Sequence, residues 1–297
     1  MNNQLKTIFL LGVMTALLVG IGRVLSPGHT GLFVGLAAAM NLGAYFFSDR
    51  LVLRISGARE VGPAEAPELH GIVDELARRA GIPKPKVFLI EREQPNAFAT
   101  GRSPAHGVVA VNTGILELID RGELRAVLAH EIGHIVHRDI LISSISAVMA
   151  AAIGYLAQSL MFSGMHGGRR DGHESASGIG GLLLMLVAPL AATLVQLGIS
   201  RSREYLADEA GAELSGEPEA LAQALRKLEQ YAAAIPAEVV PATASLYIVN
   251  PLSGGARIAR LFSTHPSTED RVERLLAMSG RGRPPAATTT HVTPTWR

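Results

Sequence analysis

The sequence predicts a mainly α-helical, multi-pass membrane protein with a smaller α+β part outside the membrane. Hydrophobic residues make up 48% of the 297 residues but aromatic residues only 5%, so the apolar content is that of packed helices. Four long apolar runs alternate with polar segments. Most Lys and Arg residues gather in two of these polar segments, which gives the chain an orientation across a bilayer.

The four apolar runs predict two pairs of membrane-spanning helices. The first pair, residues 1–47, contains the runs Thr7–Gly22 and Gly31–Phe47. A signal peptide is the alternative for the first run, but a second run follows it almost at once. The second pair, residues 140–200, contains the runs 140–162 and 178–200, whose uncharged length suffices to cross about 30 Å of hydrocarbon. Buried helices of a soluble core are the alternative, mainly for the first pair.

The positive charges predict which segments face the cytoplasm. Of the 27 Lys and Arg residues, 12 lie in residues 48–139 and 11 lie after residue 200. The positive-inside tendency therefore places the segments 48–139 and 201–279 in the cytoplasm, and residues 280–297 are expected to form a disordered tail. The net charge of +1 gives no reason to expect a nucleic-acid partner. Because the chain has no Cys, any metal must use His, Asp or Glu ligands.

Both cytoplasmic segments predict short secondary-structure elements. Helical periodicity over Ala66–Gly81 ends at a Gly-Ile-Pro stop signal. Strands are expected at 86–90, 96–100 and 107–112, and helices resume near Thr113 and at Glu123. In the second segment, helices are expected over 201–231 and Thr268–Met278.

The helix expected over 123–139 carries the pattern His-Glu-x-x-His. His130 and His134 are four residues apart and therefore share a helical face, where two imidazoles can bind one Zn²⁺ at about 2.0–2.1 Å. Glu131 can reach a metal-bound water and is the candidate catalytic base. Gly133 costs about 1 kcal/mol in helix propensity, which indicates close approach of another element or of substrate.

Chance is the alternative for this pattern, because two histidines on a helix are often only a polar face. Here the rest of the helix is apolar, so the histidines would be partly buried and need partners. His137 is interpreted as structural, since three ligands from one helix would crowd a tetrahedral site.

The third metal ligand must come from elsewhere in the chain. Glu204 follows the fourth apolar run directly, so a membrane hairpin would return it to the histidine pair at the membrane surface. Asp208 shares its helical face and can hold a ligand imidazole through the second ring nitrogen. An exposed, charged helix start is the alternative, but it does not explain why Glu204 follows the second membrane pair directly when the two histidines directly precede it.

These residues and several further segments resemble the HtpX family of membrane-bound zinc metalloproteases, which is related to the CAAX prenyl protease group. The similar segments are His130-Glu-Ile-Gly-His134, Ser202-Arg-Glu-Tyr-Leu-Ala-Asp208, Leu261-Phe-Ser-Thr-His-Pro266, Asn96-Ala-Phe-Ala-Thr-Gly101 and Asn250-Pro-Leu-Ser-Gly-Gly255. They occur in the order and spacing of that family, and the resemblance covers almost the whole chain.

The resemblance implies a zincin-like α+β catalytic domain, built from an active-site helix and a small edge β-sheet, on the cytoplasmic side of a bacterial inner membrane. It implies one Zn²⁺ per subunit, held by His130, His134 and Glu204, with Glu131 as the catalytic base. It also implies substrate binding by residues Asn96, Ala97, Phe98 and Ala99. His265 would steady the oxyanion, and a helix-capping His-Pro turn is the alternative for that residue. The implied partners are misfolded or damaged membrane proteins as substrates, the lipid bilayer and other quality-control proteases.

The expected function is therefore a zinc endopeptidase in membrane-protein quality control. Glu131 would take a proton from water and pass it to the leaving amine, while substrate lies extended along an edge strand built from residues 96–112. A CAAX-type prenyl-protein protease is the second interpretation, although that group generally has more membrane spans. A non-catalytic metal-binding scaffold is the third, and it would have no use for Glu131. A di-iron enzyme would need two Glu-x-x-His helices, and only one such pattern is present.

Overall fold

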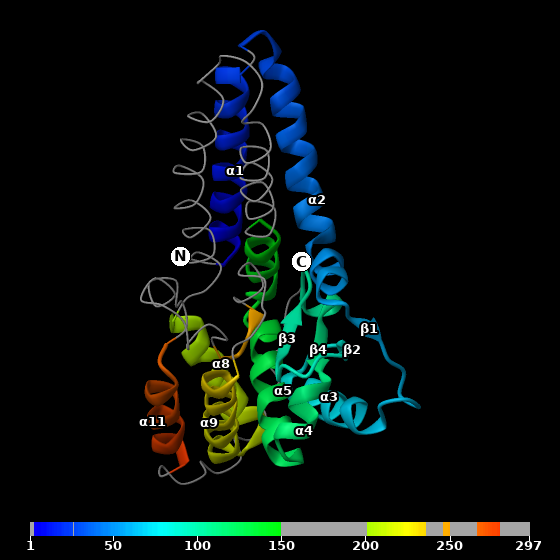
Figure 1. Ribbon diagram of the computed structural model, residues 1–297, viewed down its shortest axis with the longest axis vertical. Helices are drawn as coiled ribbons and strands as arrows, with labels where there is room; N and C mark the ends of the chain where they lie inside the picture. Colours follow the sequence, from blue (N-terminus) through cyan, green and yellow to red (C-terminus); the bar gives the residue numbers. More distant parts are fainter. Residues whose placement is uncertain (1–2, 26, 150–200, 236–245, 250–265, 280–297) are drawn as a thin grey trace, which may run out of the picture.

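The computed structural model describes residues 3–25, 27–149, 201–235, 246–249 and 266–279, and in these ranges the chain is mostly helical with one small β-sheet (Figure 1). This agrees with the predicted mainly α class. Most of the second predicted membrane pair, residue His265 and the predicted disordered tail lie outside the described residues.

Two long helices, α1 (Asn3–Leu25) and α2 (Thr30–Ser56), form a hairpin that extends from one end of the molecule (Figure 1). The 3₁₀ turn η1 (Pro27–His29) joins them. Inside the hairpin, Asn41 Nδ2 donates to the Leu11 carbonyl at 3.2 Å and to the Thr15 hydroxyl at 2.8 Å, so a polar side chain links the two apolar helices.

Among the described helices, α2 alone has the length and hydropathy of a membrane span. Only 6% of its most apolar window is buried within the molecule, so its apolar side chains face outward rather than into a core. α1 contains a shorter apolar stretch, Thr7–Gly20, and the described start of the third predicted run is a ten-residue helix, Ile140–Met149. The multi-pass arrangement thus stays a prediction.

Helix α2 continues nine residues beyond the end of the predicted apolar run at Phe47. Its last turns pack on the sheet, because Val52 and Leu53 share a buried cluster with Phe98. Gly57 then ends the helix in the left-handed region (φ 72°), which glycine adopts without a steric penalty. One uninterrupted helix therefore joins the apolar hairpin to the α+β part.

The β-sheet contains β1 (Arg59–Glu60), β2 (Lys86–Ile90), β3 (Ala97–Thr100) and β4 (Val108–Asn112), in the order β1-β2-β4-β3. β2 and β4 run parallel, and the other two pairings are antiparallel. The three predicted strands are confirmed. β1 was not predicted, because two exposed residues are too short to show an alternating pattern. β3 forms one edge of the sheet, so one side of this strand has no neighbouring strand among the described residues.

The described helices of the α+β part are α3 (Pro67–Ala80), α4 (Thr113–Leu118), α5 (Arg121–Val136), α8 (Arg201–Ser215), α9 (Pro218–Ala234) and α11 (Thr268–Ser279), with a short 3₁₀ turn, η2 (Pro104–His106). Gly81 ends α3 at φ 66°, as its stop signal predicts. The helical structure expected over 201–231 is confirmed, and Gly216 (φ 72°) divides it into α8 and α9.

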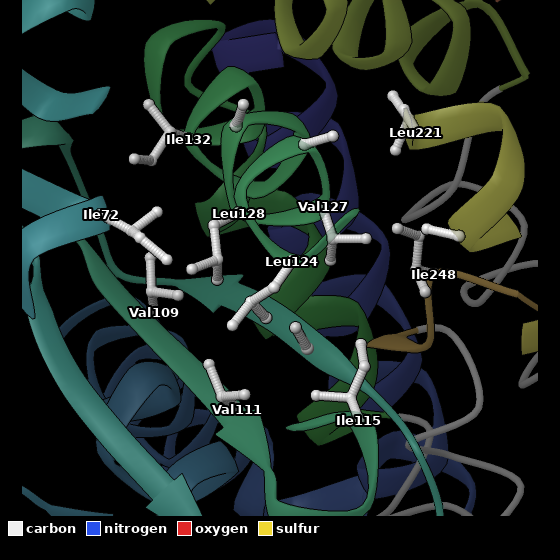
Figure 2. Close-up of a cluster of buried hydrophobic side chains, with 14 of the residues drawn as sticks. Ile72, Val109, Val111, Ile115, Leu124, Val127, Leu128, Ile132, Leu221 and Ile248 are labelled. Carbon is white, nitrogen blue, oxygen red and sulfur yellow. The ribbon is translucent and has the colours of Figure 1, made fainter. Parts of the chain in front are cut away.

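Helix α5 lies at the centre of the core, between the sheet and helices α8 and α9 (Figures 1 and 2). A capping box begins it: the Asp120 carboxylate accepts from the Glu123 N–H at 2.9 Å, and the Glu123 carboxylate accepts from the Asp120 N–H at 2.9 Å. Figure 2 shows Leu128 of α5 beside Val109 of β4. With most of its surface packed, α5 holds its side chains in fixed positions.

Candidate active site

Helices α5 and α8 bring three potential metal ligands together. His130 and His134 stand one turn apart on α5, and their Nε2 atoms are 3.2 Å apart. Glu204, in the first turn of α8, places Oε2 3.9 Å from His130 Nε2 and Oε1 3.8 Å from His134 Nε2. One ligand atom from each residue lies within 4.8 Å of the other two.

Two glycines allow α5 and α8 to approach closely enough for this. A Cβ on Gly133 of α5 would lie 3.1 Å from the Cβ of Ala210 and 3.3 Å from backbone atoms of Ala207. A Cβ on Gly211 of α8 would lie 3.0 Å from the backbone of His130. The close approach that the sequence predicts at Gly133 is therefore confirmed, and the approaching element is α8.

A carboxylate faces the second nitrogen of each histidine. His130 Nδ1 lies 2.9 Å from Asp208 Oδ1, and His134 Nδ1 lies 3.1 Å from Asp139 Oδ2. Asp208 thus lies where the sequence predicts an orienting group. Asp139 was missed by the sequence analysis, because it reaches His134 only through the left-handed conformation of Arg138 (φ 56°) at the end of α5.

The donor set fits a metal ion. When each Nδ1 donates its proton to a carboxylate, both Nε2 atoms present lone pairs toward each other and toward the Glu204 carboxylate. Such acceptors repel one another unless a cation lies between them. Ligands of a tetrahedral ion at 2.0–2.1 Å are about 3.3 Å apart, which is close to the observed separations. His130, His134 and Glu204 could therefore form a metal site.

Arg271 of α11 holds Asp208, the carboxylate that faces His130, in its position. Its guanidinium, 1% exposed, donates from Nε to Asp208 Oδ2 at 2.8 Å and from Nη2 to Asp208 Oδ1 at 2.7 Å. Its Nη1 donates to the Ile248 carbonyl at 2.7 Å. Arg271 was not predicted as a site residue, although its helical spacing with Thr268 and Leu275 indicates the buried face of its helix.

The site contains more carboxylates than guanidinium groups, and this shifts its titration. Burial raises the pKa of Glu131 to about 7, with help from Glu204 and against the opposing effect of His134. Burial opposes a charge on His134, but Asp139, Glu204 and Glu131 outweigh it and raise its pKa to about 10. Burial lowers the pKa of His130 in spite of Asp208. In the metal-free site, His134 therefore carries a second ring proton whereas His130 stays neutral, and a bound cation must displace that second proton.

Glu131 is tied directly to the edge strand. Its Oε2 accepts a hydrogen bond from the Ala99 N–H of β3 at 2.8 Å. Phe98 pairs with Ala110 in the antiparallel ladder, and the Asn96 carbonyl accepts from the Asn112 N–H at 2.9 Å. By strand alternation, the N–H and C=O groups of Ala97 and Ala99 point to the open edge instead.

A cleft of about 480 Å³, counted to its open mouth, lies between this edge and residues 246–249. Glu131 lines it together with the three potential ligands, Phe98, Ala99, Arg203 and Tyr247. The Asn96 side chain fastens the far wall, because Nδ2 donates to the Leu246 carbonyl at 3.3 Å and Oδ1 accepts from the Ile248 N–H at 3.2 Å. Asn96 is 2% exposed, so within the described residues its amide serves this wall.

Six of the predicted site residues line this cleft: Phe98, Ala99, His130, Glu131, His134 and Glu204. Ala97 and Ala99 lie at the strand edge, whereas the Phe98 side chain packs into a buried cluster. His137 is exposed at the end of α5, outside the three converging ligands. His265 lies outside the described residues, so its role stays a prediction.

A helix with two histidines and a glutamate, a carboxylate from a second helix as the third potential ligand and a cleft beside an edge strand are the arrangement expected of a metal-dependent peptidase. The profile of Peptidase family M48 matches residues 63–279, well over half of the chain. The chain therefore belongs to peptidase family M48, which confirms the family expected from its motifs.

Similar proteins carry the name Protease HtpX homolog. One from Sulfurihydrogenibium sp. is 51% identical over 294 residues, which cover 96% of this chain and 99% of the relative. Another, from Ralstonia pickettii, is 50% identical over 291 residues, which cover 96% of this chain and 100% of the relative. The chain is also similar to the crystal structure of S. mikatae Ste24p, with a TM-score of 0.48 and 21% identity, over 92% of this chain and 65% of that one.

Proposed function

We propose that the chain is a zinc-dependent endopeptidase that cleaves misfolded or damaged membrane proteins. The observation that carries this proposal is the convergence of His130, His134 and Glu204 beside Glu131, at the open edge of β3. Two imidazoles and one carboxylate are a ligand set that suits catalytic zinc. A bound zinc ion would supply Lewis acidity toward the scissile carbonyl and make water a better nucleophile.

Glu131 would move the proton in this reaction. With a pKa near neutrality in the metal-free protein, its carboxylate can accept a proton from the attacking water and later release it. The water oxygen bonds to the carbonyl carbon, the C–N bond breaks, and the proton held by Glu131 passes to the leaving amine. The Ala99 N–H fixes the orientation of the Glu131 carboxylate toward the cleft.

The substrate would pair with the open edge of β3 as an additional strand. The backbone groups of Ala97 and the carbonyl of Ala99, which point to this edge, would bind main chain, which is common to all polypeptides. Recognition of main chain suits an endopeptidase that meets many unfolded segments. The wall at residues 246–249, held by Asn96 and Arg271, would limit the side chains that enter the cleft.

Helix α2 supports a placement in the membrane. Its outward apolar surface suits a bilayer, and α1 would accompany it as the second helix of the hairpin. The predicted excess of Lys and Arg in the catalytic segments supports a cytoplasmic active site at the inner membrane of a bacterium. Other quality-control proteases would act as partners at the same membrane.

The test compares purified, detergent-solubilised wild type with Glu131→Gln and His134→Ala. Zinc content is measured by mass spectrometry, and cleavage is measured on a misfolded membrane protein and on a prenylated CAAX peptide. Glu131→Gln should keep zinc and lose activity by about 10²–10⁴-fold, because the amide cannot accept the proton. His134→Ala should lose both. Glu117→Gln, which removes an exposed carboxylate from α4, is the charge-matched control and should change neither.

Two outcomes would overturn the proposal. Full activity in zinc-loaded Glu131→Gln would exclude this residue as the base. Cleavage of the prenylated peptide alone would assign the chain to prenyl-protein processing instead.

A further inference from the structure

The surface of α2 changes from apolar to cationic within two turns. Phe46 and Phe47 are 45% and 54% exposed, and the exposed residues Arg50 and Arg54 follow on the same helical face. From Thr30 to Phe47, at 1.5 Å per residue, the helix is about 27 Å long, which is close to the thickness of bilayer hydrocarbon. The two arginines therefore lie just beyond the hydrocarbon if α2 crosses the membrane.

A third arginine reaches the same level from the α+β part. The guanidinium of Arg102, in the loop after β3, lies 6.0 Å from the centre of the Phe46 ring, and that of Arg50 lies 5.6 Å from the Phe47 ring. Arg102 Nη2 is 2.8 Å from His106 Nε2, and His106 Nδ1 is 2.8 Å from the Ser103 hydroxyl. These contacts hold Arg102 beside α2.

No carboxylate neutralises this group of arginines within the described residues. Asp49 is the first acidic residue of the sequence, and its Oδ1 accepts from the backbone N–H of Arg50. Arg50 and Arg54 are four residues apart, so their like charges repel each other. A phosphate group between the arginines would remove this repulsion.

We propose that Arg50, Arg54 and Arg102, here named the basic belt, bind the headgroup phosphate of an anionic phospholipid. The inference rests on the proposed membrane placement of α2. Guanidinium groups match phosphate geometry, and the exposed Phe46 and Phe47 rings mark the end of the apolar surface next to them. Arg102 is two residues beyond Thr100, the last residue of β3. The lipid therefore holds the end of the substrate-binding edge at the membrane surface.

The experiment reconstitutes the full chain in nanodiscs of phosphatidylcholine and phosphatidylglycerol in equal amounts. After mild extraction, native mass spectrometry counts the two lipids that remain bound. Wild type should retain phosphatidylglycerol preferentially, and Arg50→Gln and Arg102→Gln should each reduce the preference about five-fold. Arg102→Lys, which keeps the charge, should retain most of it. Arg226→Gln, an exposed charge loss on α9, is the matched control and should retain all of it.

The outcomes separate this inference from the proposal beneath it. Failure of the chain to insert into these nanodiscs would refute the membrane placement of α2. Insertion without a lipid preference, or a preference that survives Arg50→Gln/Arg102→Gln, would overturn the basic belt alone. Competition by excess inorganic phosphate would assign a soluble-phosphate site and overturn the lipid assignment. An equal loss in Arg226→Gln would indicate general charge attraction and would also overturn it.

Discussion

The buried pair of Asp208 and Arg271 allows stability and metal binding to be separated by mutation. Two hydrogen bonds of 2.7 and 2.8 Å join these side chains, and both are almost fully buried. Asp208→Asn leaves the guanidinium without its closest counter-charge, with only Glu204 Oε2 at 3.8 Å from Nη1, and Arg271→Gln leaves the Asp208 carboxylate without its guanidinium. Each single substitution should lower the free energy of unfolding by about 3–5 kcal/mol, the usual cost of an unpaired buried charge.

The double variant Asp208→Asn/Arg271→Gln removes both charges together. Its free energy of unfolding should recover most of the loss, because two neutral amides can pair without a buried ion. Its zinc affinity should not recover. His130 then lacks the carboxylate at Nδ1, and loss of such a group weakens metal binding about 10–100-fold.

Unfolding by denaturant in the metal-free state gives the free energy of unfolding, and competition with a chelator gives the zinc dissociation constant. Arg274→Gln is the control on the same helix: its guanidinium lies over the Tyr205 ring at the surface, so the substitution should cost about 1 kcal/mol or less and leave zinc binding intact. If the double variant is as unstable as the single variants, the loss of stability does not come from an unpaired buried charge. Unchanged zinc affinity in Asp208→Asn would refute the role of Asp208 at His130.

Three further predictions concern the helix contact, the cleft wall and the ion. Gly133→Ala should change the free energy of unfolding of the metal-free protein by no more than about 1 kcal/mol, since better helix propensity offsets the crowding, but it should weaken zinc binding because α8 must move. Gly71→Ala, whose added Cβ meets open space, is the control and should leave zinc affinity unchanged. Equal zinc affinities in the two variants would contradict the role of Gly133. Asn96→Ala removes two buried hydrogen bonds to the wall, so kcat/KM should fall about ten-fold at unchanged zinc content, and a normal kcat/KM would contradict that role. Chelation should lower Tm in wild type but not in His134→Ala, because only a bound ion stabilises the folded state, and equal shifts in both would place the metal elsewhere.

Local spacing explains why the centre of the site could be predicted from the sequence. His130 and His134 share a face because they are four residues apart on one helix, and Glu131 follows from the same pattern. Glu204 could be predicted because it begins a helix directly after a long apolar run. Each of these inferences needs only helical periodicity and the order of segments along the chain.

The remaining parts depend on packing between distant segments. Asp139 reaches His134 only because Arg138 adopts a left-handed conformation, for which the sequence offers no glycine signal. Arg271 looks like one charged residue among several until α11 packs against α8. Asn96 holds residues 246–248 through hydrogen bonds to partners that are 150 and 152 residues away in the sequence.

Helix α2 also fixes how far a substrate must reach. Val52 and Leu53, which share the buried cluster of Phe98, lie five or six residues beyond Phe47, or about 8–9 Å along the helix axis. If α2 crosses the bilayer, a continuous helix rather than a flexible linker therefore fixes the edge strand at about this distance from the hydrocarbon. An extended chain covers this distance in about three residues. Peptide bonds a few residues outside a membrane span come within reach of the cleft without any need to pull the span from the lipid.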